Sequence, residues 1–213
     1  AFAVVALLMG WLGTAQMAGH QVAINLASLT FMVPVGIAQA GSVRVGQAVG
    51  RDDAGAARAA VKSALLAAAG FMSLTMILFI TLPGPLTALY TDEPEVVAIA
   101  VVLIPIAGVF QVADGLQVVA AGLLRGIADT TAPFIANLLA FWMVGMPIGI
   151  YLGFRTDAGP VGLWWGLVTG LGLVAVFLVW RVRVRMRRDL ARVVIDDDVA
   201  GSPPPDLDPR ASR

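Results

Sequence analysis

The stretch "VVAIAVVLIPIAGVFQVADGLQVVAAGLL", residues 96–124, carries one charged side chain, Asp114, in an otherwise apolar run. About 20 apolar residues cross a hydrocarbon layer of about 30 Å, and this run would be about 43 Å long as a straight helix. Counted back from Leu124, Asp114 lies about 15 Å inside the run at helical rise. The stretch therefore predicts a membrane-spanning helix with a carboxylate near the bilayer midplane.

The rest of the chain has the same character. Of its 213 residues, 59% are hydrophobic and 13% are charged, and the mean hydropathy is +0.86. Soluble helices keep a polar face, and these apolar runs do not. We expect an all-α membrane protein, a bundle of six transmembrane helices with the first one truncated at residue 1. The predicted spans cover residues 1–12, 21–40, 63–82, 96–124, 132–154 and 161–180.

Charge segregation predicts the orientation. One set of loops and ends is basic, with Arg44, Arg51, Arg58, Lys62, Arg125, Arg181, Arg183, Arg185, Arg187, Arg188 and Arg192. The opposite set carries only Arg155 beside several acids. The positive-inside rule makes the basic side cytoplasmic, so both ends of the chain are expected there. Aromatic residues fall at the predicted helix ends as interfacial belts: Trp11, Tyr90, Tyr151, Trp164 and Trp165 outside, Trp180 inside.

The segments between and after the spans differ in composition. In "GRDDAGAARAAVK", residues 50–62, Asp52 and Asp53 precede an alanine-rich stretch, which predicts an N-cap and a short helix on the cytoplasmic surface whose basic residues face water and headgroups. Residues 81–95 contain three prolines and predict a turn-rich outer loop. Residues 189–213 are polar and rich in proline and acid, which predicts a disordered cytoplasmic tail.

Polar residues inside the spans are the candidate site. Gly108, Gln111, Asp114 and Gln117 recur every three residues, which predicts one helix face turned toward a cavity or another helix. The second span carries Asn25, Ser28, Met32 and Gln39, and the fifth carries Asn137. Each amide has an alternative reading as an interhelical hydrogen bond worth about 0.6 kcal/mol. Pro34, Pro105 and Gly108 are candidate bending points during gating.

Asp114 indicates cation chemistry. A charge at the helix centre costs about 2.5–3.5 kcal/mol on insertion scales, and the predicted spans contain no Lys or Arg to pair with it. A carboxylate in a wet cavity binds a proton, Na⁺ or an organic cation, and these exclude one another. That exclusion is the minimal chemistry of an antiporter.

Other site chemistries find little support in these residues. The chain has no cysteine and one histidine, so we expect no metal site other than Na⁺ at Asp114 and no cofactor other than a coupling ion, Na⁺ or H⁺. Asp114 has no acidic or nucleophilic partner in the spans, so no enzyme is expected. Gly162, Gly166 and Gly170 form a packing surface between helices. His20, at the predicted start of the second span, is expected at the membrane interface.

Two stretches carry a family resemblance. "AGHQVAINLASLTFMVPVGIAQAGSVRVGQAVG", residues 18–50, and "DGLQVVAAGLLRGIADT", residues 114–130, resemble the multidrug and toxic compound extrusion (MATE) transporters of the bacterial sodium- or proton-coupled type, and residues 1–188 resemble their C-terminal six-helix lobe. The resemblance implies twelve helices in two lobes around a cavity, with alternating access. Asp114 would then belong to a cation site, with Gln111, Gln117, Asn25 and Asn137 as further cation- or substrate-binding candidates.

The resemblance also implies partners and location. We expect organic cations as substrates, a bilayer, and an N-terminal lobe outside these residues, in a bacterial inner membrane, and no nucleic acid. A glutamate on the first helix of the lobe, also outside these residues, would complete the cation site. A related lipid or polysaccharide flippase stays as an alternative, although its cavity would need basic residues that these spans lack. A membrane scaffold that transports nothing is a second alternative.

Overall fold

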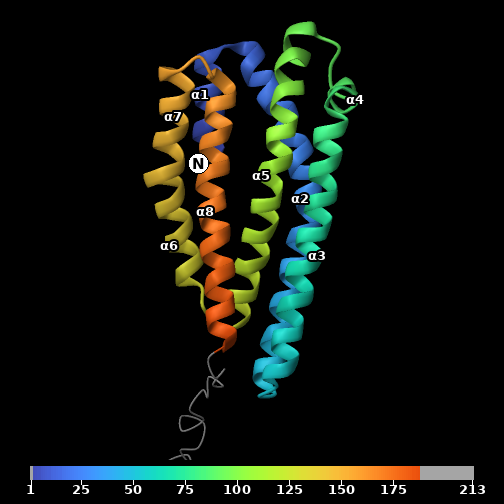
Figure 1. Ribbon diagram of the computed structural model, residues 1–213, viewed down its shortest axis with the longest axis vertical. Coiled ribbons are helices and arrows are strands. Elements are labelled where there is room, and N and C mark those ends of the chain that lie inside the picture. Colours follow the sequence, from blue (N-terminus) through green and yellow to red (C-terminus); the bar gives the residue numbers. More distant parts are fainter. Residues whose placement is uncertain (1, 188–213) are drawn as a thin grey trace, which may run out of the picture.

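The computed structural model describes residues 2–187, and they form a bundle of roughly parallel helices (Figure 1). The elements are α1 (Phe2–Leu12), α2 (Thr14–Gly50), α3 (Ala54–Thr81), α4 (Pro83–Ala88), α5 (Pro94–Gly126), α6 (Thr131–Leu139), a π-helical turn η1 (Ala140–Gly145), α7 (Met146–Arg155) and α8 (Gly159–Arg187). Within the described residues, five helical segments are long and apolar enough to cross a membrane, and α1 is shorter. The predicted all-α architecture is confirmed. The predicted tail, residues 189–213, lies outside the described residues.

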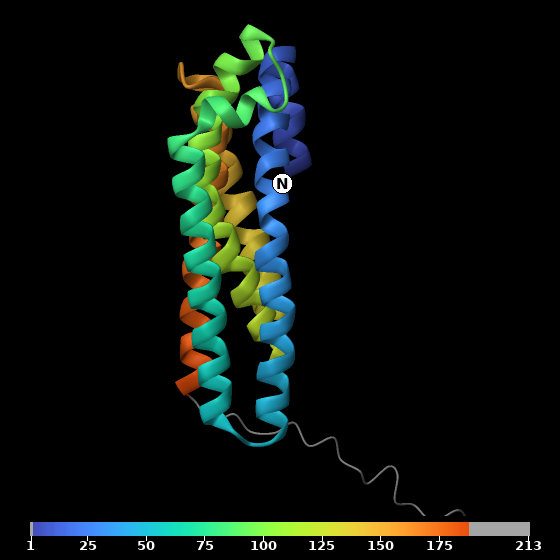
Figure 2. The ribbon, with the colours of Figure 1, turned by 90° about the vertical axis from the view of Figure 1, so that its right-hand side faces the viewer.

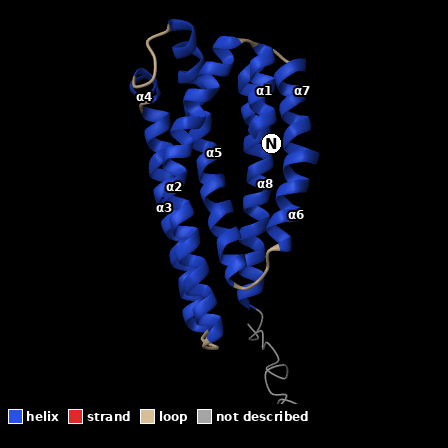
Figure 3. Cartoon of the chain, turned by 180° about the vertical axis from the view of Figure 1, so that it is seen from behind, coloured by secondary structure: helices blue, strands red, loops and turns tan. Residues whose placement is uncertain are grey.

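The long central helix of the bundle is α5. It packs against α2, α3 and α8, while α7 and η1 pack against α8 (Figures 1 and 3). Small residues bring α2 and α5 close together, because a Cβ built on Gly122 would lie 2.7 Å from the carbonyl oxygen of Ala38. Asp114 is therefore carried by a helix that packs against α2, α3 and α8, and residues of α2 line its pocket.

The prediction of a separate surface helix at residues 54–62 is wrong. These residues form the first turns of α3, which runs on unbroken to Thr81 and lies alongside α2 (Figure 2). The predicted N-cap is confirmed at Asp53, whose Oδ1 accepts a hydrogen bond from the Ala56 backbone N–H at 2.8 Å. No proline interrupts residues 54–82, so nothing ends the helix where the membrane begins. Arg58 does not simply face water, since its Nε donates to the Met186 carbonyl oxygen at 3.0 Å.

The fifth span contains a feature that the sequence analysis missed. Residues 140–145 form a π-helical turn between α6 and α7. Pro147 lies two residues after this turn, and in a regular α-helix its ring would clash with the carbonyl group of Met143. A wider turn ahead of the proline relieves that clash. By contrast, α2 continues through Pro34 and α5 continues through Pro105.

The aromatic-belt prediction fails at one position. Trp11, Tyr90, Tyr151, Trp165 and Trp180 are exposed on the described residues, but Trp164 is fully buried. It packs edge-on against His20 at 5.6 Å and against Phe110 at 5.8 Å between ring centroids. His20 is likewise buried, so its predicted interfacial position is wrong. The reason is that α2 begins at Thr14, which places His20 inside the helix and under α8.

Candidate functional site

Asp114 lines a small pocket between α2 and α5. The pocket has a volume of about 350 Å³, and its other lining residues are Ile24, Ala27, Ser28, Phe31 and Phe110. Asp114 is half-buried. A larger groove of about 780 Å³ lies elsewhere, between α6 and α8, and no acidic residue lines it. The chemistry therefore places the candidate cation site in the smaller pocket, because of these two pockets only the smaller one is lined by an acidic side chain.

The Asp114 carboxylate has no protein partner within residues 2–187. The ion pairs recorded there both involve Asp129, and no hydrogen bond to Asp114 is present. The other polar side chain in the lining, the Ser28 hydroxyl, donates to the Ile24 carbonyl oxygen at 2.7 Å and keeps its lone pairs. A cation entering this pocket would thus meet carboxylate and hydroxyl oxygens without displacing a bound arginine or lysine.

Gln111 lies one turn toward the outer end of α5 from Asp114 and is buried. Its amide contacts the Thr30 hydroxyl, which also lies 2.9 Å from the Ala27 carbonyl oxygen. The Thr30 hydroxyl is the donor in this contact and Oε1 of Gln111 is the acceptor. The buried Nε2 of Gln111 has no hydrogen-bond partner within residues 2–187. Thr30 was not a sequence candidate, since only the α2–α5 register brings it to Gln111.

Gln117 points elsewhere. Its Nε2 donates to Oδ1 of Asn137 at 3.2 Å, and Asn137 Nδ2 donates to the Pro133 carbonyl oxygen at 2.8 Å. The expected single face from Gly108 to Gln117 is therefore wrong. At about 100° per residue, a spacing of three drifts by about 60° per step, so four such residues cover about 180° of the helix. Gln117 and Asn137 form an interhelical hydrogen bond between α5 and α6.

Asn25 is exposed on α2 and does not line the Asp114 pocket. Its Oδ1 accepts a 3.4 Å hydrogen bond from Gln21 Nε2 on the same helix. Its predicted binding role stays a prediction. The gating candidates are packed positions: a Cβ on Gly108 would lie 3.2 Å from the Met76 carbonyl oxygen, and Pro34 lies beside Gly115. Gly108 thus lets α5 approach α3, and the proposed bending at Pro34 and Pro105 also stays a prediction.

Few side chains in the described residues could bind a metal ion. Within residues 2–187, no group of three or more His, Cys, Asp or Glu side chains is placed to hold a metal ion. The buried imidazole Nδ1 of His20 and the indole Nε1 of Trp164 have no hydrogen-bond partner in this part of the chain. The pocket between α2 and α5 offers one carboxylate, that of Asp114, to an exchangeable cation.

Comparison with known proteins assigns the chain to a family. The MatE family pattern matches residues 1–151, about 71% of the chain. The chain belongs to the MatE family. It is 43% identical over 189 residues to the multidrug resistance protein NorM of Burkholderia vietnamiensis, covering 86% of this chain and 41% of that protein. It is also 43% identical over 197 residues to a probable NorM of Brucella suis, covering 90% and 41%.

Solved MATE structures share its fold. The eukaryotic MATE transporter AtDTX14 superposes with a TM-score of 0.80 at 25% identity, covering 86% of this chain and 41% of that one. An outward-facing MATE multidrug resistance transporter superposes with a TM-score of 0.77 at 18% identity, covering 86% and 41%. The MatE chain described here thus spans about two-fifths of the length of its relatives and corresponds to one lobe of the MATE fold.

Proposed function

We propose that this chain is the C-terminal lobe of a secondary transporter that exports cationic organic compounds in exchange for Na⁺ or H⁺ by alternating access. The observation that carries the proposal is the unpaired Asp114 carboxylate in the pocket between α2 and α5. Relatives named for multidrug resistance support the efflux class. A charge near the midplane is costly, so a structure that leaves it without a protein partner favours a mobile cation as its partner.

The exchange follows from competition for one carboxylate. When the pocket opens outward, a coupling cation neutralises Asp114, and when the pocket faces inward that cation leaves. An organic cation that needs the same negative charge binds only when the coupling ion is absent. Gln111 would hold the neighbouring turn of α5 against α2 through Thr30, which fixes the position of Asp114 relative to Ser28.

The site would be completed by residues outside this chain. Ser28 and Asp114 supply too few oxygens to surround Na⁺, so water, the other lobe or a preceding acidic residue must provide the rest. We place the protein in the bacterial inner membrane with the C-terminus cytoplasmic, because Arg181, Arg183 and Arg185 crowd that end. A C-terminal green fluorescent protein fusion that stays dark, beside a bright cytoplasmic control, would contradict this orientation.

Ethidium efflux from cells expressing the full-length transporter tests the role of Asp114. Asp114→Asn removes the charge with little change in shape and should lower efflux at least tenfold, while Asp114→Glu should retain part of it. Glu95→Gln is the matched control, because it removes an exposed carboxylate from the first turn of the same helix. Equal efflux for Asp114→Asn and the parent protein, with the same dependence on Na⁺ and pH, would refute the assigned role.

The coupling ion is assigned by a second measurement on the same cells. Efflux is followed while Na⁺ is varied at fixed pH and then while pH is varied without Na⁺. The proposal expects one of the two gradients to drive efflux and Asp114→Asn to remove that dependence. Efflux that is equally fast in the absence of both a Na⁺ gradient and an H⁺ gradient would show that the transporter is not an antiporter.

A further inference from the structure

The groove of about 780 Å³ lies between α6, η1 and α8 and belongs to a different part of the fold from Asp114. Ile135, Leu139 and Met143 form one wall, and Leu173 and Phe177 form the other. Every lining side chain is apolar except Thr131 and Arg181. Ile135, Leu139 and Met143 are each at least 46% exposed, so the groove presents contiguous apolar surface outward.

The groove opens on the outside of the helix bundle. On α6 and η1, Asn137 and Phe141 form the flank turned inward: Asn137 contacts Gln117 of α5, and Phe141 lines a small cavity with Val5 of α1. Ile135, Leu139 and Met143 occupy the opposite flank. An occupant of the groove would therefore approach from the bilayer side and would not block the Asp114 pocket.

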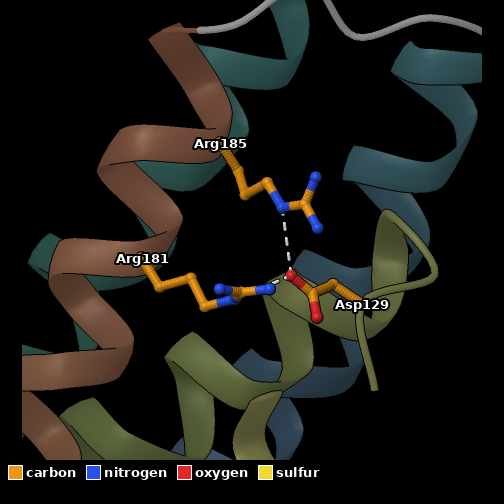
Figure 4. Close-up of polar contacts among 3 residues, drawn as sticks. All are labelled: Asp129, Arg181 and Arg185. Atoms are coloured by element: carbon orange, nitrogen blue, oxygen red, sulfur yellow. Dashed lines mark hydrogen bonds and ion pairs between the residues drawn. The ribbon is translucent and has the colours of Figure 1, made fainter. Parts of the chain in front are cut away.

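One end of the groove is basic. Arg181 lines both the groove and an adjoining hollow whose other walls are Trp180, Val184 and Arg185. The Nε atoms of Arg181 and Arg185 lie 2.8 Å and 3.1 Å from the same oxygen, Oδ2 of Asp129 (Figure 4). Two guanidinium groups therefore share one carboxylate, which leaves one excess positive charge. Among residues 2–187, the terminal guanidinium nitrogens of both arginines have no recorded partner.

The dimensions match one leaflet. Leu173 and Arg181 are eight residues apart, or about 12 Å along a helix, while half of the hydrocarbon core is about 15 Å. Trp180 is 56% exposed beside the basic end, as expected at a headgroup boundary. Guanidinium groups bind phosphate oxygens through parallel hydrogen bonds, and their free terminal nitrogens are the atoms that do so.

We propose that this groove is a binding site for an anionic phospholipid. One acyl chain lies along the apolar walls of α6, η1 and α8, and the headgroup phosphate sits on Arg181 and Arg185. The lipid neutralises the charge that Asp129 leaves uncompensated. It also fills the space where α6 separates from α8, so it ties the fifth span to the C-terminal helix.

Native mass spectrometry of the full-length protein, delipidated and then titrated with phosphatidylglycerol or phosphatidylcholine, tests the site. One arginine at a membrane surface contributes about fivefold to the affinity for anionic lipid. Arg181→Gln should therefore weaken phosphatidylglycerol binding about fivefold at the tightest site. Arg183→Gln is the matched control, since it removes an exposed charge from the same turn of α8 outside the groove. Equal effects of the two substitutions would overturn the site.

Two further variants keep the proposal testable if Arg181→Gln does not fold. Asp129→Asn removes the competing carboxylate, so phosphatidylglycerol should bind more tightly; unchanged or weaker binding would show that the arginines serve Asp129 alone. Ala136→Phe fills the groove and should displace the lipid, whereas Leu138→Phe, on exposed surface outside the groove, should not.

Lipid controls decide the nature of the occupant. Phosphatidylcholine binding as tight as phosphatidylglycerol binding would overturn the requirement for net negative charge. If the rest of the transporter covers the groove, neither Ala136→Phe nor Arg181→Gln will change lipid binding, and the proposal fails.

Discussion

Gly166 of α8 and Gly149 of α7 meet backbone to backbone: a Cβ built on Gly166 would lie 2.4 Å from the Cα of Gly149. Gly145 and Gly170 meet in the same way one turn further along. At these glycines the backbones of the fifth and last spans are in direct contact, which is how small residues stabilise helix pairs in lipid. This contact holds the fifth span to the last one above the place where α6 separates from α8.

Gly166→Ala should destabilise the protein by about 1–3 kcal/mol, because the added methyl group overlaps backbone atoms that cannot rotate away. Gly172→Ala is the control, since a Cβ there meets nothing within 4 Å. Both changes bring the same gain in helix propensity, so their difference isolates the steric term. Unfolding in mixed detergent micelles measures both free energies, and equal stability of the two variants would contradict the tight contact.

Asp129→Ala should lower the free energy of unfolding by about 1–3 kcal/mol, because it removes charged hydrogen bonds to Arg181 and Arg185. Asp92→Ala, in an exposed loop on the opposite predicted membrane side, is the control. Loss of stability in the control of equal size would show that the ion pairs contribute nothing specific.

The same ion pairs predict a pH dependence. Burial alone would raise the pKa of Asp129, but the hydrogen bonds and positive charges of Arg181 and then Arg185 outweigh it and hold the pKa below its ordinary value. A carboxyl group whose pKa is lower in the folded protein than in the unfolded chain stabilises the fold fully at pH values above its unfolded pKa, which is near 4. That stabilisation is lost as the pH falls through the pKa of the folded protein. The stability difference between parent protein and Asp129→Ala should therefore be constant from about pH 8 to 5 and shrink below about pH 4. A difference that disappears near pH 6 would be inconsistent with this assignment.

Thr30→Val should cost about 1–3 kcal/mol, because the buried Gln111 amide loses its polar neighbour on α2. Thr169→Val is the matched control, since the Thr169 hydroxyl bonds only to the Trp165 carbonyl oxygen of its own helix. The expected order of melting temperatures in detergent is parent, Thr169→Val, then Thr30→Val. An unchanged melting temperature for Thr30→Val would remove the evidence that this pair fixes α2 against α5.

Gln117 and Asn137 should couple by about 0.6 kcal/mol in a double-mutant cycle of unfolding free energies with Gln117→Leu and Asn137→Leu. Ethidium efflux of the same variants separates structure from function. Efflux that falls in proportion to the amount of folded protein supports a packing role only. A larger loss of efflux in either variant, at equal amounts of folded protein, would return that residue to the binding site.

Sequence alone determined the membrane class, the helical fold and the helix that carries Asp114. Each rests on a property that survives without tertiary contacts: the length of apolar runs against the bilayer thickness, and the cost of a charge at the midplane. The glycines at Gly162, Gly166 and Gly170 were also recognised as a packing surface, because their spacing of four already defines one helix face.

Only the tertiary structure decided which polar groups meet. A spacing of three could not keep Gln111, Asp114 and Gln117 on one face, because the helix turns about 100° per residue. Gln117 therefore bonds to Asn137, while Asp114 lines a pocket with Ser28. Three polar contacts join residues that are distant in sequence, and the sequence did not predict them. They are Thr30 with Gln111, Arg58 with Met186, and Asp129 with Arg181. Such pairs depend on the register and rotation of one helix against another, and side-chain packing in the assembled bundle fixes those quantities.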